Sequence, residues 1–399
     1  MHHTVRENGE SVWLVCRYAE ARAVLADTRF SSDRYRTADM GSLTEEQRKV
    51  VTDTQRRAGA LLQLDPPQHT RYRRLLAGQF TMRRMRKLRA FIEETVTARL
   101  DTMLAAGSPA DLVAQFAQPV PTLIICELLG VPYADRARFQ DWTATFQRLD
   151  ISVDERHESE RRLHEFMVEL VRRKRVEPAD DIISALVQDR SAHPPLTDVE
   201  LANIANQLLI GGHETTANTV ALGTFALLEH PDQLSALRAD PTLIDGAVDE
   251  LLRFLSIVQL GLFRVTTEDV ELAGVRIPAN NLVLISTLAA NLDARRWPDA
   301  ATLDISRDQG PHLAFGHGIH LCVGQQLARA EMTIAFTHLL RRLPNLRLAV
   351  PADKIPLRQN AAIHGVISLP VAWDSRNAHP APPSPGRGPR PRKQPPGSA

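Results

Sequence analysis

Apolar residues recur at spacings of three and four positions along most of this chain, which is the pattern of amphipathic helices. The pattern predicts helices over 18–26, 83–105, 119–130, 134–148, 158–174 and 196–230. Short apolar stretches predict strands at 11–17, 263–265, 270–272 and 282–285, with a further β region over 346–373. The chain is therefore expected to be mainly helical, with small β sheets.

Composition narrows the class of protein. The 399 residues are 43% hydrophobic, which allows a sizeable core. The formal net charge of +1 gives no global field that would favour nucleic acid or an anionic membrane. No apolar run is long enough to span a bilayer and no signal peptide is visible, so a cytoplasmic location is expected. The segment 374–399 is rich in Pro, Gly, Arg and Ser and is expected to be a disordered tail.

The chain has three cysteines, and only one of them lies in a distinctive context. Cys16 and Cys126 have apolar neighbours and are expected to be small buried hydrophobes. Cys322 ends the stretch Phe-Gly-His-Gly-Ile-His-Leu-Cys, and Val323 and Gly324 lead from it into a strong helical pattern. The free N–H groups at a helix start stabilise a thiolate. Closely spaced glycines let the backbone turn tightly and approach a flat ligand.

A shielded thiolate of this kind suits a haem iron that cleaves O–O bonds. Judged by the cysteine alone, a glycine-rich turn with a buried free thiol is the better interpretation. A zinc site formed by His317, His320 and Cys322 is a third interpretation, but the sequence offers no second ligand cluster to complete it.

The predicted helix over 196–230 carries Gly211-Gly212-His213-Glu214-Thr215-Thr216 near its middle. Each glycine costs about 1 kcal/mol relative to Ala in a helix interior, so helical hydrogen bonding is expected to weaken here and to leave room for a small ligand or a water molecule. A tolerated kink with a surface acid is the alternative. The apolar flanks argue for a buried Glu214, which makes it a functional candidate.

Two further pairs of residues share a helix face. Glu250 and Arg253 are three positions apart and can form an ion pair, which by itself would be an ordinary helical salt bridge. His69 and Arg73 are four apart, after a plausible helix cap at Asp65, and can together bind one carboxylate. A solvated basic helix is the alternative for the second pair.

Together these motifs resemble a known family. Phe315-x-x-Gly318-x-x-x-Cys322-x-Gly324 is similar to the haem-binding signature of the cytochrome P450 family, in the form with His320 that soluble actinobacterial members carry. The resemblance implies that Cys322 is the axial iron ligand. It also places Glu214 and Thr215 at the family's catalytic acid and alcohol. The haem propionates would be held by His69, Arg73, Arg264 and His320.

By the same resemblance Glu250 and Arg253 match the Glu-x-x-Arg motif, which braces the core under the haem. The family often adds a third, basic partner from the stretch before the cysteine loop. Thr302 falls at that position here, and Arg307 is the expected substitute.

The resemblance implies one large α+β domain over 1–373, although this sequence lacks the residues that family members usually carry before the first strand. Haem b would lie between the 196–230 helix and the Cys322 loop. The implied reaction is the insertion of one atom of O2 into a C–H or double bond of a hydrophobic small molecule, such as a macrolide, terpenoid or steroid. The expected pocket is formed by 40–62, 145–160, Leu208, Leu209, Gly212, Val258, Gln259, Leu260 and Ile363.

Electrons must come from a partner, since three scattered cysteines cannot hold an iron–sulfur cluster. A ferredoxin with an NAD(P)H-dependent reductase is implied for a monomeric enzyme. Its docking face would include Arg71, Arg73, Arg74, Arg83, Arg84, Arg86, Lys87 and Arg89. A catalytically silent helper protein is one alternative, but it would be expected to lack Cys322. A peroxide-driven enzyme is another, but it would be expected to lack the acid–alcohol pair.

Overall fold

A computed structural model describes residues 1–5, 11–33, 45, 58–80, 82–136, 138, 142, 152–259, 262–308, 310–358 and 363–374. Within these ranges, none of the helices combines the length and the apolar character that crossing a bilayer would require. Most of the helix predicted over 134–148 and the tail predicted over 374–399 lie outside the described residues.

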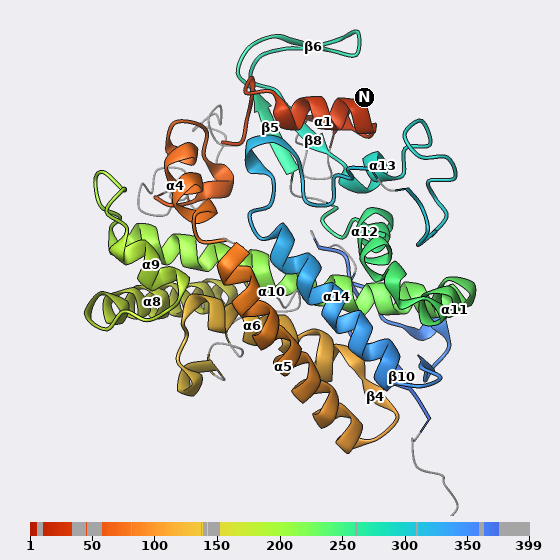
Figure 1. The fold of residues 1–399 in the computed structure, drawn as a ribbon. Helices are drawn as coiled ribbons and strands as arrows, with labels where there is room; N and C mark the ends of the chain where they lie inside the picture. The colour runs from red at the N-terminus through yellow and green to blue at the C-terminus, as the bar shows by residue number, and fades with distance from the viewer. Residues whose placement is uncertain are drawn as a thin grey trace, which may run out of the picture.

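Helices form most of the structure. They are α1 (Tyr18–Ala26), α4 (Gln68–Ala77), α5 (Met82–Ala106), α6 (Pro119–Leu129), α8 (Val153–Val176), α9 (Ile182–Gln188), α10 (Asp198–Glu229), α11 (Pro231–Ala239), α12 (Ile244–Leu255), α13 (Thr287–Asn291) and α14 (Gln325–Arg342). Helix α10 crosses the middle of the molecule, and α6, α8, α12 and α14 all contact it (Figure 1).

The sequence explains why α10 is long and central. A capping box starts it, because Thr197 Oγ1 accepts a hydrogen bond from the Glu200 N–H at 3.2 Å while Glu200 accepts one from the Thr197 N–H at 2.7 Å. Pro231 opens the next helix directly after His230, the residue that caps its end. Side chains on every side of α10 are buried, as expected for a helix that is apolar around most of its surface.

The strands are short and form three sheets. They are β1 (His2–Val5), β2 (Ser11–Val15), β3 (Phe30–Ser31), β4 (Ala110–Asp111), β5 (Leu262–Thr266), β6 (Val270–Leu272), β7 (Val275–Ile277), β8 (Leu282–Ile285), β9 (Arg347–Leu348) and β10 (Pro370–Ala372). The main sheet has the order β1-β2-β8-β5-β3, the second β4-β10-β9, and β6 pairs with β7. In Figure 1 the main sheet lies at the top with α1 across it, above the helices.

The mainly helical fold with small sheets is confirmed. The structure adds a strand at the start of the chain that the sequence pattern did not predict, formed by residues 2–5. This strand, β1, lies at the edge of the main sheet and pairs antiparallel with β2 in the register His2 with Leu14. All four side chains of β1 are exposed, so no alternation of buried and exposed positions could have predicted it.

Candidate active site

The Cys322 loop is fixed by two glycines and one hydrogen bond. Gly316 and Gly318 have φ angles of 74° and 73°, in the left-handed region that favours glycine. A Cβ at Gly318 would overlap the Leu25 carbonyl, so the loop packs directly on the backbone of α1. The Cys322 N–H donates to the Phe315 carbonyl at 3.0 Å, and α14 begins three residues after the cysteine.

Burial raises the pKa of the Cys322 thiol above its usual value. The backbone N–H of Gly324 and the charges of Arg73 and Arg329 lower it, but desolvation is the larger effect. The helix start therefore acts in the direction that the sequence suggested and is outweighed by burial. On the other side of the loop the Arg329 guanidinium lies 4.6 Å from the centre of the Phe315 ring and is held by Asp249 at 2.8 Å.

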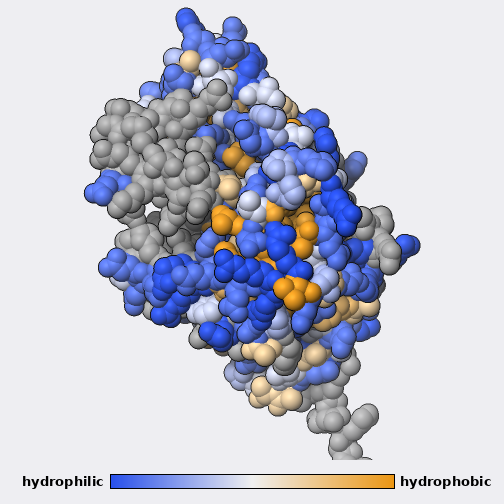
Figure 2. Space-filling model, turned by 90° about the vertical axis from the view of Figure 1, so that its left-hand side faces the viewer, coloured by the Kyte–Doolittle hydropathy of each residue, from blue (hydrophilic) through white to orange (hydrophobic). Residues whose placement is uncertain are grey.

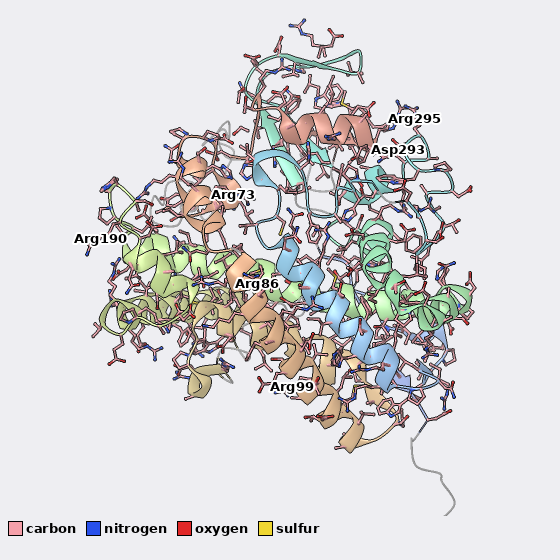
Figure 3. The ribbon with its side chains drawn as sticks, viewed as in Figure 1. Arg73, Arg86, Arg99, Arg190, Asp293 and Arg295 are labelled. Carbon is pink, nitrogen blue, oxygen red and sulfur yellow. The ribbon has the colours of Figure 1, made fainter. Side chains whose placement is uncertain are left out.

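Four basic side chains from distant segments gather beside this loop. His69 and Arg73 come from α4, Arg264 from β5 and His320 from the turn before Cys322. The rings of His69 and His320 lie 4.2 Å apart, and Arg73 points from α4 toward the middle of the molecule (Figure 3). Burial and the neighbouring positive charges lower the pKa of His320 to about 3. Burial also lowers the pKa of Arg73 and of Arg264.

This cluster is suited to a ligand with carboxylate groups. His69 is only 2% exposed, and its Nε2 atom is buried without a hydrogen-bond partner. Arg264 is 6% exposed, and its guanidinium donates to the carbonyl of its own neighbour Phe263. Open space surrounds the Cβ positions of Gly211 on α10 and Gly324 beside the cysteine. A flat group with two carboxylates would fit these residues, with its metal held by the Cys322 thiolate.

The zinc interpretation finds no support in the described residues, because no three His, Cys, Asp or Glu side chains there are grouped to hold a metal ion. Instead, His317 accepts a hydrogen bond from Arg22 Nε at 3.2 Å, and His320 Nε2 lies 2.8 Å from Ser32 Oγ.

The two glycines were expected to weaken the hydrogen bonding of this helix. Helix α10 nevertheless continues through Gly211 and Gly212 without a break. The Thr215 hydroxyl donates to the Gly211 carbonyl at 2.7 Å and so adds a bond to this turn. Glu214 is 12% exposed, and its Oε1 atom accepts a hydrogen bond from Arg358 Nη1 at 2.6 Å. Arg358 could not be predicted from the sequence, since nothing local connects it to α10.

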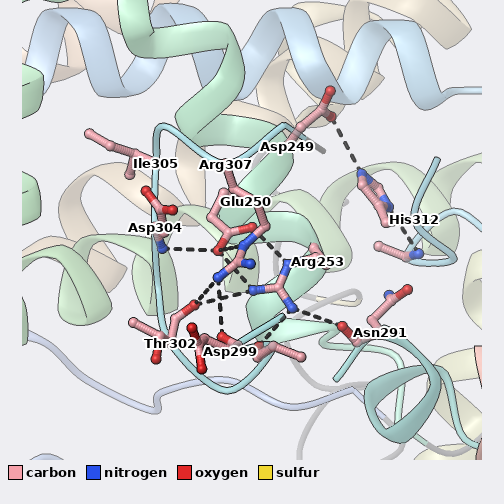
Figure 4. Close-up of polar contacts among 12 residues, drawn as sticks. Asp249, Glu250, Arg253, Asn291, Asp299, Thr302, Asp304, Ile305, Arg307 and His312 are labelled. Carbon is pink, nitrogen blue, oxygen red and sulfur yellow. Dashed lines mark hydrogen bonds and ion pairs between the residues drawn. The ribbon is translucent and has the colours of Figure 1, made fainter. Parts of the chain in front are cut away.

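Glu250 and Arg253 form a fully buried ion pair with distances of 2.7 and 2.8 Å (Figure 4). Arg307 is the third partner, because its Nε lies 3.2 Å from Glu250 Oε1. Thr302 contributes only its backbone carbonyl, which accepts hydrogen bonds from both arginines. The substitution of Arg307 for the usual third position is thus seen directly in the geometry.

Several residues of the predicted docking face already form ion pairs within this chain. Arg71 is paired internally with Glu200 at 2.7 Å, while Arg84 and Lys87 pair with Asp180. Arg89 pairs with Glu93, and the Arg83 side chain lies outside the described residues. Arg74 and Arg86 remain as exposed cations of α4 and α5, and Figure 3 places Arg86 and Arg99 along α5.

The predicted pocket residues are only partly grouped. Val258 and Ile363 form an isolated antiparallel bridge, whereas Leu209 is fully buried in the core and Gly212 packs against Ile125. Leu208 and Gln259 are partly buried. Leu260 and most of 40–62 and 145–151 lie outside the described residues. Figure 2 shows apolar side chains near the middle of the face on which Figure 1 places α4 and α9.

The family model of cytochrome P450 matches residues 136–370 of this chain. The chain belongs to the cytochrome P450 family. It is 46% identical over 366 residues to pentalenic acid synthase of Streptomyces avermitilis, which covers 92% of this chain and 89% of the relative. It is 44% identical over 377 residues to the monooxygenase PikC of Streptomyces venezuelae, with 93% and 88% covered.

Solved structures of cytochromes P450 agree with this assignment. The crystal structure of Rif16 is 52% identical and covers 92% of this chain and 91% of its own, with a TM-score of 0.81. The structure of CYP105P1 in complex with filipin I is 42% identical and covers 93% and 92%, with a TM-score of 0.85. This cytochrome P450 is therefore a monooxygenase, and its family implies a haem-thiolate cofactor and the use of O2.

Proposed function

We propose that this cytochrome P450 binds haem b through Cys322 and oxidises a hydrophobic secondary metabolite, with electrons from a ferredoxin. The observation that carries the cofactor proposal is the group of four basic side chains beside the cysteine loop. Two of them, His69 and Arg264, are buried, and within the described residues none of the four forms an ion pair with a carboxylate. His69, Arg73, Arg264 and His320 would bind the propionates. When bound, the haem supplies the activation of O2 and the transfer of one oxygen atom to the substrate.

The overall reaction consumes O2, two electrons and two protons for each hydroxylated or epoxidised product, and the second oxygen atom leaves as water. Thr215 and Glu214 would carry the protons. The Thr215 O–H donates a hydrogen bond to the Gly211 carbonyl, and the hydroxyl oxygen can still accept a hydrogen bond from a water molecule. Glu214 can then exchange protons between this water and the surroundings.

Electrons would reach the site from NAD(P)H through a reductase and a ferredoxin. The exposed cations Arg74 and Arg86 suit an acidic partner, since complementary charge accelerates association. A substrate of macrolide, terpenoid or steroid type is supported by the relatives, which include a mycinamicin IV hydroxylase/epoxidase and a vitamin D3 dihydroxylase. A panel of such compounds, screened for shifts of the haem absorption band, would identify the class.

The proton role is tested by Thr215→Ala in the haem-loaded enzyme with ferredoxin and reductase. Electron entry does not need the hydroxyl, so NAD(P)H consumption should stay near normal while most electrons appear as hydrogen peroxide. Thr215→Ser should be much milder because it keeps the hydroxyl. Unchanged product per NAD(P)H in Thr215→Ala would reject the proposal.

A further inference from the structure

The C-terminal hairpin, residues 357–366 without the undescribed 359–362, contacts α10 beside the proposed proton-carrying acid. Arg358 Nη1 donates to Glu214 Oε1 at 2.6 Å across 144 positions of sequence. The side chains are 21% and 12% exposed, so solvent screens the pair less than it screens a surface salt bridge. Across the described chain, no other basic side chain lies within ion-pair distance of Glu214.

The backbone at Leu357 and Arg358 is held by contacts with 365–366. Leu357 and Val366 form an antiparallel bridge, and the Arg358 N–H donates to the Gly365 carbonyl at 2.9 Å. The hairpin is also tied to the segment after α12, because the His364 N–H donates to the Ile257 carbonyl at 2.7 Å. The guanidinium therefore starts from a fixed base.

A second contact joins the hairpin to α10 one turn further on. Gly365 is buried so closely against Asn218 that a Cβ would overlap the Asn218 amide. The Asn218 amide in turn donates to the Glu214 backbone carbonyl at 2.8 Å. Residues four apart share a helix face, so the hairpin covers the face that presents Glu214. The orientation of the acid thus depends on how the hairpin sits.

The hairpin also belongs to the predicted pocket wall, since Ile363 bridges to Val258. We propose that Arg358 is the positioning residue of Glu214, and that the hairpin links the wall of the substrate pocket to the orientation of this acid. The inference rests on the proposed role of Glu214. Without Arg358, the carboxylate loses the side-chain hydrogen-bond donor that the described residues give it, and proton transfer becomes poorly directed.

The first experiment tests the pairing without any turnover. Urea midpoints of the holoenzyme are compared for Glu214→Gln, Arg358→Gln and the double variant. If the two side chains act together, the double variant loses no more than the more affected single variant. Arg347→Gln is the matched control, because Arg347 forms a 3.0 Å pair with Asp374 near the same end of the chain but on the surface. Additive losses in the double variant would overturn the inference.

The second experiment tests the consequence. Product yield per NADPH and the pH profile of kcat are measured with a 7-alkoxycoumarin as surrogate substrate and a plant-type ferredoxin system. Arg358→Gln should lower the yield several-fold and move the pH profile, and Arg358→Lys should restore most of both. Arg347→Gln should resemble the parent.

The outcomes separate the two proposals. An impaired Glu214→Gln beside a normal Arg358→Gln would overturn the positioning role alone. A normal Glu214→Gln would reject the proton role of the acid, and the positioning role with it. Impairment of both with rescue by Lys supports both.

Discussion

The buried pair of Glu250 and Arg253 is completed by Arg307, and removing Arg307 gives the sharpest test of this architecture. Its guanidinium is 11% exposed and donates to the carbonyls of Pro298, Asp299 and Thr302 at 2.7, 3.1 and 3.0 Å, besides its contact with Glu250. Hydrogen bonds to charged groups contribute about 1.5–3 kcal/mol each. Glu250 keeps Arg253, and water can reach some of the carbonyls after truncation. Arg307→Ala should therefore lower the free energy of unfolding by about 2–3 kcal/mol.

Arg253→Ala should lower the free energy of unfolding further, by about 3–5 kcal/mol in total. Arg253 is fully buried, and its loss removes the main partner of a buried carboxylate. Thr302→Ala is the matched control. Thr302 is exposed and uses only its backbone carbonyl here, so its truncation should change stability by about 0.5 kcal/mol or less.

The assay is urea unfolding of the holoenzyme, followed by tryptophan fluorescence and haem absorbance together, since two coincident transitions are needed for a two-state analysis. Trp297 is a suitable reporter because its ring lies 5.6 Å from the Arg253 guanidinium. An Arg307→Ala enzyme as stable as Thr302→Ala would refute the claim that Arg307 is the third partner.

Three further predictions concern the cofactor, the partner and a buried acid. His69→Ala/Arg73→Ala should release haem to apomyoglobin faster than the parent, and equal release rates would show that these residues do not hold the propionates. Turnover with ferredoxin should fall as ionic strength rises, whereas peroxide-supported turnover should not. Arg86→Gln should weaken this salt dependence. Arg89→Gln alters a residue that is already paired with Glu93 and should leave the salt dependence unchanged. Burial raises the pKa of Glu331 well above its usual value, so the folded state keeps a proton that the unfolded chain loses above about pH 4.3, and stability must fall as the pH rises from there. Glu331→Gln should accordingly stabilise the protein at pH 8 and have little effect at pH 4, and an equal gain at both values would contradict this assignment.

Much of this protein could be predicted because its key motifs are local. The spacing of apolar residues predicted α1, α5, α6, α10 and most of the strands, since burial of one face depends on a short sequence period. Gly316 and Gly318 mark the turn of the cysteine loop, because their positive φ angles lie in the left-handed region that favours glycine. Glu250 and Arg253 were paired correctly because three positions along a helix already bring two side chains together.

Only the tertiary structure decided which distant groups meet. The same run of arginines that looked like one docking face divides into paired residues such as Arg71 and unpaired, exposed ones such as Arg86. The reason is that the acids come from other parts of the chain, Glu200 from α10 and Asp180 from the segment between α8 and α9. Arg358 reaches Glu214 from the far end of the chain, and no local pattern distinguishes it from other arginines. Charge attracts over distance without regard to sequence spacing, so the partner of a buried ion is set by the path of the whole backbone.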